Sequence, residues 1–120
     1  MLSPDNRLRR RVDFTAVVRR GRRAARPLLT VHLLPAAGAD GCVRAGLVVS
    51  KAVGGSVVRS QVARRLRHQL RDVLPSTTWL PAGTHLVIRA QPAAATATSS
   101  ALGADLGAAL NRLAPRTAPS

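Results

Sequence analysis

The sequence predicts a single small domain built from both helices and strands. Apolar residues recur at three- and four-residue spacing in three segments, and three other segments are short apolar runs bounded by turn residues. The chain has 120 residues, of which 46% are hydrophobic, so it can bury one core of ordinary size. We place the domain at residues 1–113 and expect residues 114–120 to form a disordered tail.

The first helix is expected from about Val12 to Arg20, after a basic and irregular arm at residues 1–10. Its apolar residues have the spacing of a short amphipathic helix. Gly21 follows at the position where a residue in the left-handed conformation commonly ends a helix. We therefore expect Gly21 to be the C-cap.

Three strands are expected from apolar runs between turn signals. The first runs from about Leu28 to Leu34, between two prolines, and the turn "AAGADG" follows it. The second covers residues 42–51 and is enriched in β-branched residues at its end. The third comes after a loop rich in proline and threonine, at about His85 to Ala90.

Two further helices complete the pattern. The second helix begins near Ser56, which can cap it, and ends at Pro75. Its single apolar stripe consists of Val58, Val62, Leu66, Leu70 and Val73. The last helix follows "TATSS", which can cap it, and repeats Leu102, Leu106, Leu110 and Leu113 along one face.

The charge of the chain points to a polyanionic partner. Nineteen Lys and Arg against five acidic residues give a net charge of +14, which opposes compaction by self-repulsion. Arg64, Arg67 and Arg71 fall on the side of the second helix opposite its apolar stripe, with Arg65 toward one flank and Arg59 in the first turn. A merely solvated face is the alternative, but acidic residues hardly interleave with these arginines, so we favour polyanion binding.

The turn before this helix contains Gly54 and Gly55. Glycines there let the backbone approach a phosphate at the helix N-terminus, where free N–H groups and the helix dipole favour an anion. A plain strand-to-helix turn is the alternative. Phe14 and Trp79 are the only aromatic residues, so a site for unpaired bases has to rely more on charge and arginine stacking than on rings, and either ring can instead be part of the core.

Several functional classes lack the residues that they need. The five aspartates are scattered singly, the three histidines and Cys42 have no metal-ligand spacing, and no phosphate-binding loop motif occurs. We therefore expect no catalytic residue, metal site, bound cofactor or small-molecule substrate in the protein alone. A single cysteine excludes an internal disulfide, and no 18-residue apolar run occurs, so we expect a cytoplasmic protein that binds no membrane.

Three stretches in order resemble the bacterial ribonuclease P protein component. They are "RLRRRVDFTAVVRRG", "RAGLVVSKAVGGSVVRSQVARRLR" and "LVIRAQPAA", which together lie within residues 4–113. The resemblance implies an α+β domain in the order αβββαβα, with a mixed sheet and a left-handed βαβ crossover. One strand more is implied than the apolar pattern shows. We expect it either as a short pairing near residues 51–54 or through a division of the segment at residues 42–51.

The resemblance also implies two sets of site residues. The RNA-binding residues that it implies are Lys51, Arg59, Arg64 and Arg67, to which we add Arg65 and Arg71 of the second helix and the N-terminal Arg9, Arg10 and Arg11. Phe14, Val18 and His32 fall where the family lines a cleft for the 5′ leader of the substrate. The chain departs from the family pattern at Ala52, Gly55, Ser60, Gln61 and Ala63, and in the late strand Arg89 is displaced, so that it can point to the wrong face.

The function that the resemblance implies is that of the protein subunit of ribonuclease P. Such a subunit binds the catalytic RNA and precursor tRNA, and catalysis lies in Mg²⁺ ions bound through the RNA. Two alternatives remain open from the sequence: a ribosomal or RNA-chaperone type RNA-binding protein, and a sequence-neutral DNA-binding protein. Preference for RNA over DNA would exclude the DNA-binding protein. Rescue of leader cleavage by a catalytic RNA at low Mg²⁺ would distinguish a ribonuclease P subunit from a ribosomal or RNA-chaperone type protein.

Overall fold

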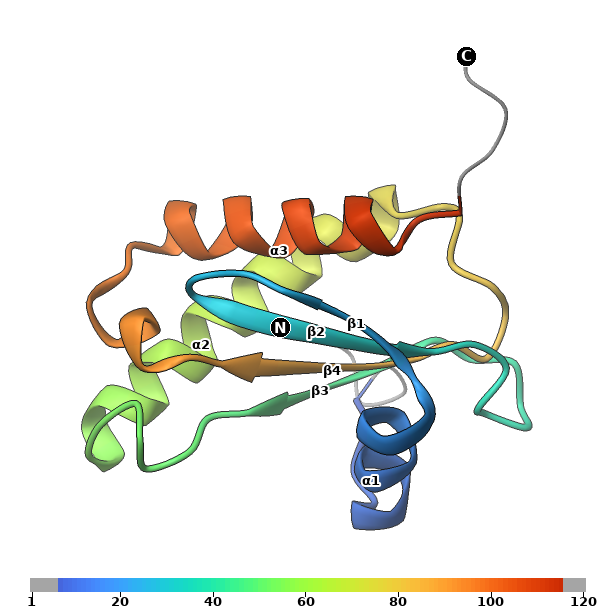
Figure 1. The fold of residues 1–120 in the computed structure, drawn as a ribbon, viewed down its shortest axis with the longest axis horizontal. Coiled ribbons are helices and arrows are strands. Elements are labelled where there is room, and N and C mark those ends of the chain that lie inside the picture. The colour runs from blue at the N-terminus through green and yellow to red at the C-terminus, as the bar shows by residue number, and fades with distance from the viewer. Residues whose placement is uncertain (1–6, 116–120) are drawn as a thin grey trace.

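The computed structural model describes residues 7–115 and has the expected order αβββαβα (Figure 1). The elements are α1 (Arg11–Arg20), β1 (Arg22–Ala25), β2 (Leu29–Leu34), β3 (Arg44–Val48), α2 (Ser56–Val73), β4 (His85–Ala90) and α3 (Ser99–Leu113). Two short 3₁₀ helices, η2 (Leu74–Ser76) and η3 (Pro92–Thr96), follow α2 and β4.

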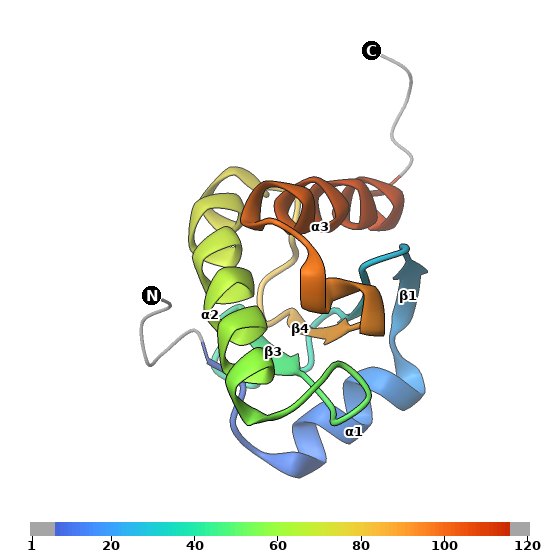
Figure 2. The ribbon, with the colours of Figure 1, turned by 90° about the vertical axis from the view of Figure 1, so that its left-hand side faces the viewer.

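The four strands form one mixed sheet in the order β1-β2-β4-β3. β1 pairs with β2 and β2 with β4 in antiparallel fashion, whereas β3 and β4 are parallel. Between β3 and β4 the chain passes through α2 on one face of the sheet, in a left-handed crossover (Figures 1 and 2). This hand is rare for such a connection.

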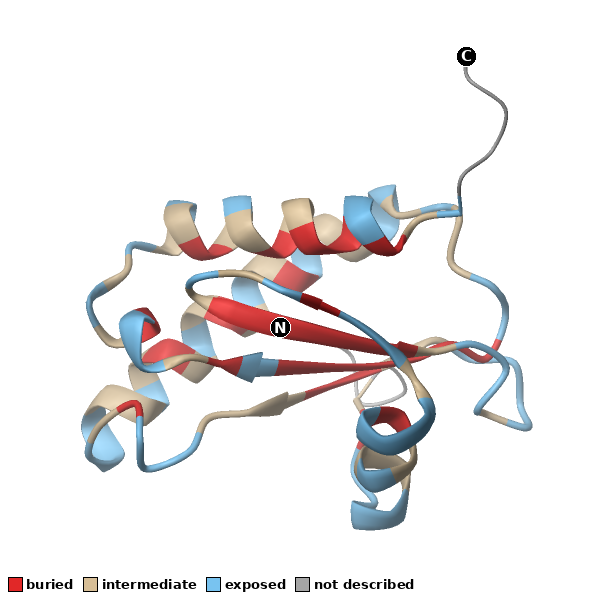
Figure 3. Ribbon diagram, viewed as in Figure 1, coloured by how far each residue is buried: buried red, intermediate tan, exposed pale blue. Residues whose placement is uncertain are grey.

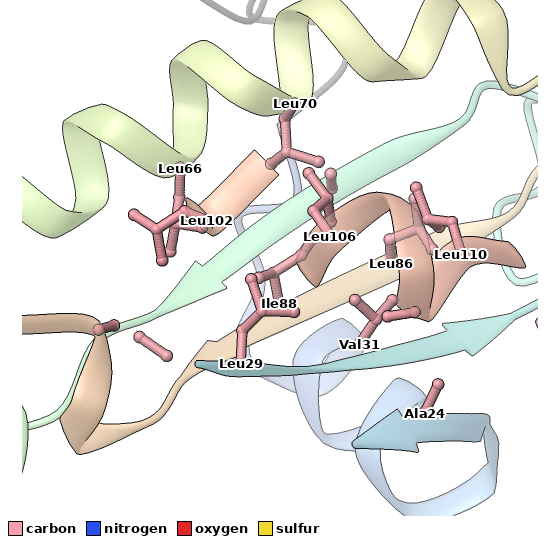
Figure 4. Close-up of a cluster of buried hydrophobic side chains, with 14 of the residues drawn as sticks. Ala24, Leu29, Val31, Leu66, Leu70, Leu86, Ile88, Leu102, Leu106 and Leu110 are labelled. Atoms are coloured by element: carbon pink, nitrogen blue, oxygen red, sulfur yellow. The ribbon is translucent and has the colours of Figure 1, made fainter. Parts of the chain in front are cut away.

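The main core lies between the sheet and the two long helices, α2 and α3. Alternate residues of each strand point into it, because successive side chains of a strand lie on opposite faces. From the strands come Leu29, Val31, Leu33, Leu86 and Ile88, and from the helices Val62, Leu66, Leu70, Leu102, Leu106 and Leu110 (Figures 3 and 4). The predicted apolar stripes of both helices therefore face the sheet, and Trp79 packs against the edge of this core.

The opposite face of the sheet is covered only in part, by α1. A second, small cluster joins Leu8, Val17 and Val87, with Phe14, Leu34 and Val48 packed against it. We call this side of the sheet the α1 face. Its strand residues alternate with those of the main core: Thr30, His32 and Leu34 on β2, His85, Val87 and Arg89 on β4, and Gly46 and Val48 on β3.

Both expectations for the fourth strand were wrong. Residues 51–53 form a turn, and the segment at residues 42–51 contains one strand, Arg44–Val48. The additional strand is β1, directly after α1, where it forms the outer strand of a hairpin with β2. Its sequence, "RRAA", has no apolar alternation, because only Ala24 is buried and the arginines face solvent.

The expected glycine cap is confirmed only in position, and the serine cap is wrong. Gly21 is the C-cap of α1, but it has extended backbone angles and is not in the left-handed region. A glycine is required there because a Cβ would collide with the carbonyl oxygens of Val17 and Leu33. The N-cap of α2 is Gly55, so Ser56 is already its first helical residue. At α3 the expected cap is present, since the Thr98 hydroxyl accepts a hydrogen bond from the N–H of Ala101.

The basic arm is more ordered than its sequence indicates. Arg7 forms a parallel bridge to Ala45 of β3, and the N–H of Leu8 donates to the carbonyl of Ala45 at 2.9 Å. The Leu8 side chain is buried under α1. Residues 1–6 of the arm, and residues 116–120 of the predicted tail, lie outside the described residues. The domain boundary at residue 113 coincides with the end of α3 but stays a prediction.

Candidate nucleic-acid interface

The arginines of α2 divide between its two flanks. Arg65 is on the flank toward α3, where its Nη1 donates to the Ala97 carbonyl at 3.3 Å. Arg59 and Arg67 lie on the other flank, beside β3, and Arg64 and Arg71 are exposed on the outer surface. We call the four residues Arg59, Arg64, Arg67 and Arg71 the basic flank of α2. Because β3 is an edge strand, this flank is not covered by a further strand.

A groove of about 310 Å³ runs between α2 and the edge of β3. Apolar residues of β3 and of the segment just after it form one wall, and residues of α2 form the other. The lining residues are Leu47, Val49, Ser56, Arg59, Ser60, Ala63 and Arg67. Arg59 is half-buried and its Nε has no hydrogen-bond partner among the described residues. Because Arg59 lines the groove, its guanidinium is placed to bind a phosphate there.

The turn into α2 leaves one side of the helix N-terminus open. A Cβ at Gly55 would meet nothing within 4 Å, whereas at Gly54 it would collide with the Val58 side chain. Gly54 therefore packs against the helix, and Gly55 is the position where a ligand has access to the backbone. Lys51 is exposed in the same turn, and Ser60 and Gln61 lie one turn further along the helix.

Phe14 is seated on the sheet by a glycine that sequence reasoning missed. A Cβ at Gly46 of β3 would overlap the Phe14 ring, so the ring lies directly against the strand backbone. Phe14 is half-buried and packs against the cluster of Leu8, Val17 and Val87. An isolated glycine inside a strand often marks such a close approach, and that signal was available in "RAGLVV".

His32 lies on the same face but offers little surface. It is only 5% exposed, and its Nδ1 has no hydrogen-bond partner among the described residues. Burial lowers the pKa of His32, and the positive charges of Arg23 and Arg89 lower it further. The imidazole is therefore neutral at pH 7, so the positive charge around it comes from the two arginines.

The structure brings the three expected cleft residues to one face. Phe14 and Val18 come from α1, with Val18 43% exposed, and His32 from β2 beneath. Arg89 shares this face, because it alternates with Ile88 and Ala90 of the main core, and it is exposed. The α1 face therefore combines a half-buried ring, an exposed valine and exposed arginine charge.

The three arginines of the arm do not lie together. Arg9 and Arg10 line a pocket with Arg7, whereas Arg11 lies on the outer surface of α1 beside Val12 and Thr15. In residues 7–115, no three His, Cys, Asp or Glu side chains are grouped so that they could hold a metal ion. None of the helices in this range is long and apolar enough to cross a membrane.

Comparison with known proteins places this geometry in a family. A family model described as Ribonuclease P matches residues 2–114. The chain is 54% identical over 120 residues to the ribonuclease P protein component of Streptomyces avermitilis, covering 94% of this chain and 95% of the relative. It is 52% identical over 118 residues to that of Rhodococcus opacus, covering 94% and 92%.

Solved structures agree with the fold. The ribonuclease P protein of Staphylococcus aureus superimposes with a TM-score of 0.76 at 20% identity, over 90% of this chain and 94% of that one. The protein from Thermotoga maritima gives 0.68 at 20% identity, over 94% and 98%. At this identity the structures show the shared fold, and the sequence matches carry the family. The chain therefore belongs to the ribonuclease P protein component family.

Proposed function

We infer that this chain is the protein subunit of ribonuclease P, which removes 5′ leaders from precursor tRNA as a complex with a catalytic RNA. The observation that carries this inference is the match to protein components of ribonuclease P over nearly the whole length of both chains. The basic flank of α2 and the α1 face supply the two surfaces that such a subunit needs. We place the protein in the cytoplasm, where its RNA partners are made.

The basic flank of α2 is proposed to bind the catalytic RNA. Four guanidinium groups line one side of a rigid helix, and Asp72, beside Arg71, is the only carboxylate of the helix. Arginine binds phosphate through a planar pair of donors, and a regular row of such groups follows a nucleic-acid backbone. Lys51 and the open backbone at Gly55 extend this surface beyond the start of the helix.

The α1 face is proposed to receive the 5′ leader. An unpaired strand needs a ring or guanidinium on which bases stack and positive charge for its phosphates. Phe14 supplies the ring, Val18 an apolar contact, and Arg89 and Arg23 the charge. His32 is too deeply buried to be a stacking surface and instead forms the floor of this face.

The catalytic centre is proposed to lie in the RNA, with Mg²⁺ bound there. Two carboxylates of the described chain are already used for structure. Asp40 pairs with Arg44, and Asp105 accepts from the N–H of Leu28 at 2.9 Å and pairs with Arg26. The role of this chain is then to bind and orient the two RNAs.

Reconstitution tests the proposed function. Purified protein is combined with the cognate catalytic RNA at low Mg²⁺, and cleavage of a precursor tRNA is followed. We expect the protein to increase cleavage at the leader junction, and protein without catalytic RNA to cleave nothing. Equal cleavage with and without the protein, under conditions in which it binds the RNA, would point to an RNA-binding protein of another class.

A Phe14→Leu variant tests the α1 face. Leucine keeps most of the apolar contact with Val17 and Val87 but removes the ring, so we expect a change in leader binding rather than unfolding. Base stacking on a ring is worth about 1–3 kcal/mol, and we expect the lower end because only one ring is available.

The measurement compares the affinity of the reconstituted complex for leader-bearing and leaderless tRNA. We expect a loss of several-fold for the former and almost none for the latter. A matched control is Val12→Ala, which removes an exposed apolar side chain of the same helix. Equal losses for both tRNAs, or a large fall in melting temperature for Phe14→Leu, would show that Phe14 serves only the core.

A further inference from the structure

Two of the three histidines lie buried on the α1 face of the sheet. His32 on β2 is 5% exposed, and His85 on β4 is 4% exposed. They are diagonal neighbours, because His32 pairs with Val87 and His85 pairs with Leu34 in the antiparallel register of the two strands. Val87 and Leu34 both belong to the small cluster that holds α1 on the sheet. Each histidine therefore lies beside an apolar contact of α1.

The two faces of the sheet differ in their buried titratable groups. The side chains buried between the sheet and helices α2 and α3 are apolar. Among residues 7–115, His32 and His85 are the only buried side chains that titrate near neutral pH. The third histidine, His68, is exposed on α2. A proton taken up by a buried histidine thus acts on the layer that α1 forms and not on the main core.

The surroundings of His32 disfavour a positive charge on its ring. Its Nδ1 is buried without a hydrogen-bond partner among the described residues, so protonation would bury an N–H group that has no acceptor there. Burial lowers the pKa of His32, and the charges of Arg23 on β1 and Arg89 on β4 lower it further. The last turn of α1 adds two more positive charges, those of Arg19 and Arg20.

His85 is also buried in its neutral form. Its Nε2 has no hydrogen-bond partner among the described residues. Burial lowers the pKa of His85 more than the negative charge of Asp13 on α1 raises it; Arg44 on β3 also lowers it, and Asp40 raises it. Arg44 holds the pKa of Asp40 at about 2, so this carboxylate stays ionised wherever histidine titrates. The ring lines the pocket on the outer flank of α1, together with the arm residues Arg7, Arg9 and Arg10.

α1 is held less firmly than the other long helices. The centre of its cluster consists of Leu8, Val17 and Val87, whereas 18 buried residues form the main core. Its N-cap, Arg10, makes no side-chain capping hydrogen bond. An element with few buried apolar contacts opens at a lower free energy than the whole domain. Helix α1 can therefore leave the sheet while the main core stays folded.

We propose that α1 is a proton-sensitive element, docked on the sheet while His32 and His85 are neutral and released, with the main core intact, when they are protonated. Release gives both rings access to water and moves their charge away from the neighbouring arginines. Phe14 is carried by α1, so it leaves its seat on Gly46 at the same time. The α1 face is thus an assembled surface only in the neutral state of the two histidines.

The direction of the pH dependence follows from proton linkage. Both pKa values are lowered in the docked state from the ordinary value of 6.5. Docking is therefore at full strength above pH 6.5 and weakens as the pH falls through the lowered values, because the released state binds more protons. The opening constant of α1 rises by up to about tenfold per pH unit for each histidine in this range.

Hydrogen exchange of the whole protein without RNA tests the proposal, so its result does not depend on the proposed function. The opening constants of α1 (Arg11–Arg20) and α2 (Ser56–Val73) are measured between pH 7.5 and 5.5, with correction for the intrinsic exchange rate at each pH. We expect α1 to open more readily than α2 at every pH, and its opening constant to rise by about tenfold or more across this range. Equal opening constants in the two helices, or an α1 opening constant that does not change with pH, overturn the proposal.

Substitution of the histidines assigns the effect. In His32→Gln/His85→Gln we expect the rise in the α1 opening constant to be less than about twofold, since neither glutamine takes up a proton. The matched control, His68→Gln, removes the exposed histidine and should keep the full rise. A rise of wild-type size in the double variant overturns the proposal. If the double variant does not fold, each single variant should keep a rise of only about threefold, and full rises in both single variants overturn the proposal.

Discussion

Replacement of both Arg64 and Arg67 by alanine is expected to weaken binding of the catalytic RNA about 100-fold at moderate salt. A charge-assisted hydrogen bond contributes about 1.5–3 kcal/mol, which corresponds to roughly tenfold or more for each arginine. Arg64 is exposed, and Arg67 lines the groove beside β3, so both guanidinium groups are available to RNA. Neither belongs to the apolar stripe that holds α2 on the sheet, so the fold should remain intact.

The measurement is a salt titration of RNA affinity for wild type and variant. We expect the slope of log affinity against log salt to fall by about 1.4–1.8, since two phosphate contacts are lost. The matched control is Arg20→Ala/Arg112→Ala, which removes two exposed charges from the ends of α1 and α3. Similar slopes for the two variants would mean that α2 acts only through its contribution to net charge. A fall in melting temperature would instead assign Arg64 and Arg67 a structural role.

Leu66→Ala is expected to lower the free energy of unfolding by about 2–5 kcal/mol. Leu66 is fully buried at the centre of the α2 stripe, between the helix and the sheet (Figure 4). A large buried side chain that is cut back to a methyl group loses its transfer free energy and leaves a cavity. Because small domains are stable by only about 5–15 kcal/mol, the loss is a large share of the total.

Chemical denaturation at constant salt measures this effect, with Val57→Ala as the control. Val57 is on the same helix but 70% exposed, and we expect it to change stability by less than about 0.5 kcal/mol. Equal effects of the two substitutions would contradict the packing of α2 on the sheet. RNA affinity of the folded Leu66→Ala protein should stay near that of wild type, because no arginine is moved to another face.

The apolar periodicity of α2 and α3 was sufficient to predict both helices and the faces that they bury. Leu66 in α2 and Leu106 in α3 each belong to an apolar stripe with the three- and four-residue spacing of a helix that packs on a sheet, and both are buried in the main core. The position of β2 followed in the same way from its apolar run. Burial of apolar side chains determines these parts of the fold, and the spacing of apolar residues in the sequence indicates which side chains are buried.

β1 and the arm could not be predicted by the same argument. The strand residues Arg22 and Arg23 are exposed, and their pairing with β2 is made by backbone groups that carry no side-chain signal. Arg7 and Leu8 join β3 through the backbone in the same way. The pocket on the outer flank of α1 depends on this pairing, since it brings the arm arginines next to Arg44.

The arginine pattern of α2 predicted a basic face, but its division between flanks depended on tertiary packing. Arg65 is turned toward α3 and donates to a backbone carbonyl, while Arg59 and Arg67 lie beside β3. Periodicity places residues around a helix but does not say which neighbour each flank meets. The resemblance placed Phe14 and His32 on one face, and only the structure shows that Gly46 makes room for the ring.

The pairing of the arm with β3 also affects how the protein behaves at high concentration. β3 is an outer strand, and an outer strand presents unpaired backbone groups on which a second molecule can add a strand of its own. Leu8 occupies part of that edge through its bond to the Ala45 carbonyl. On the opposite edge, the short β1 carries Arg22 and Arg23, whose charges repel an approaching copy. One edge of the sheet is thus protected by its own chain and the other by charge, so removal of the arm through Leu8 would expose β3 to intermolecular strand pairing.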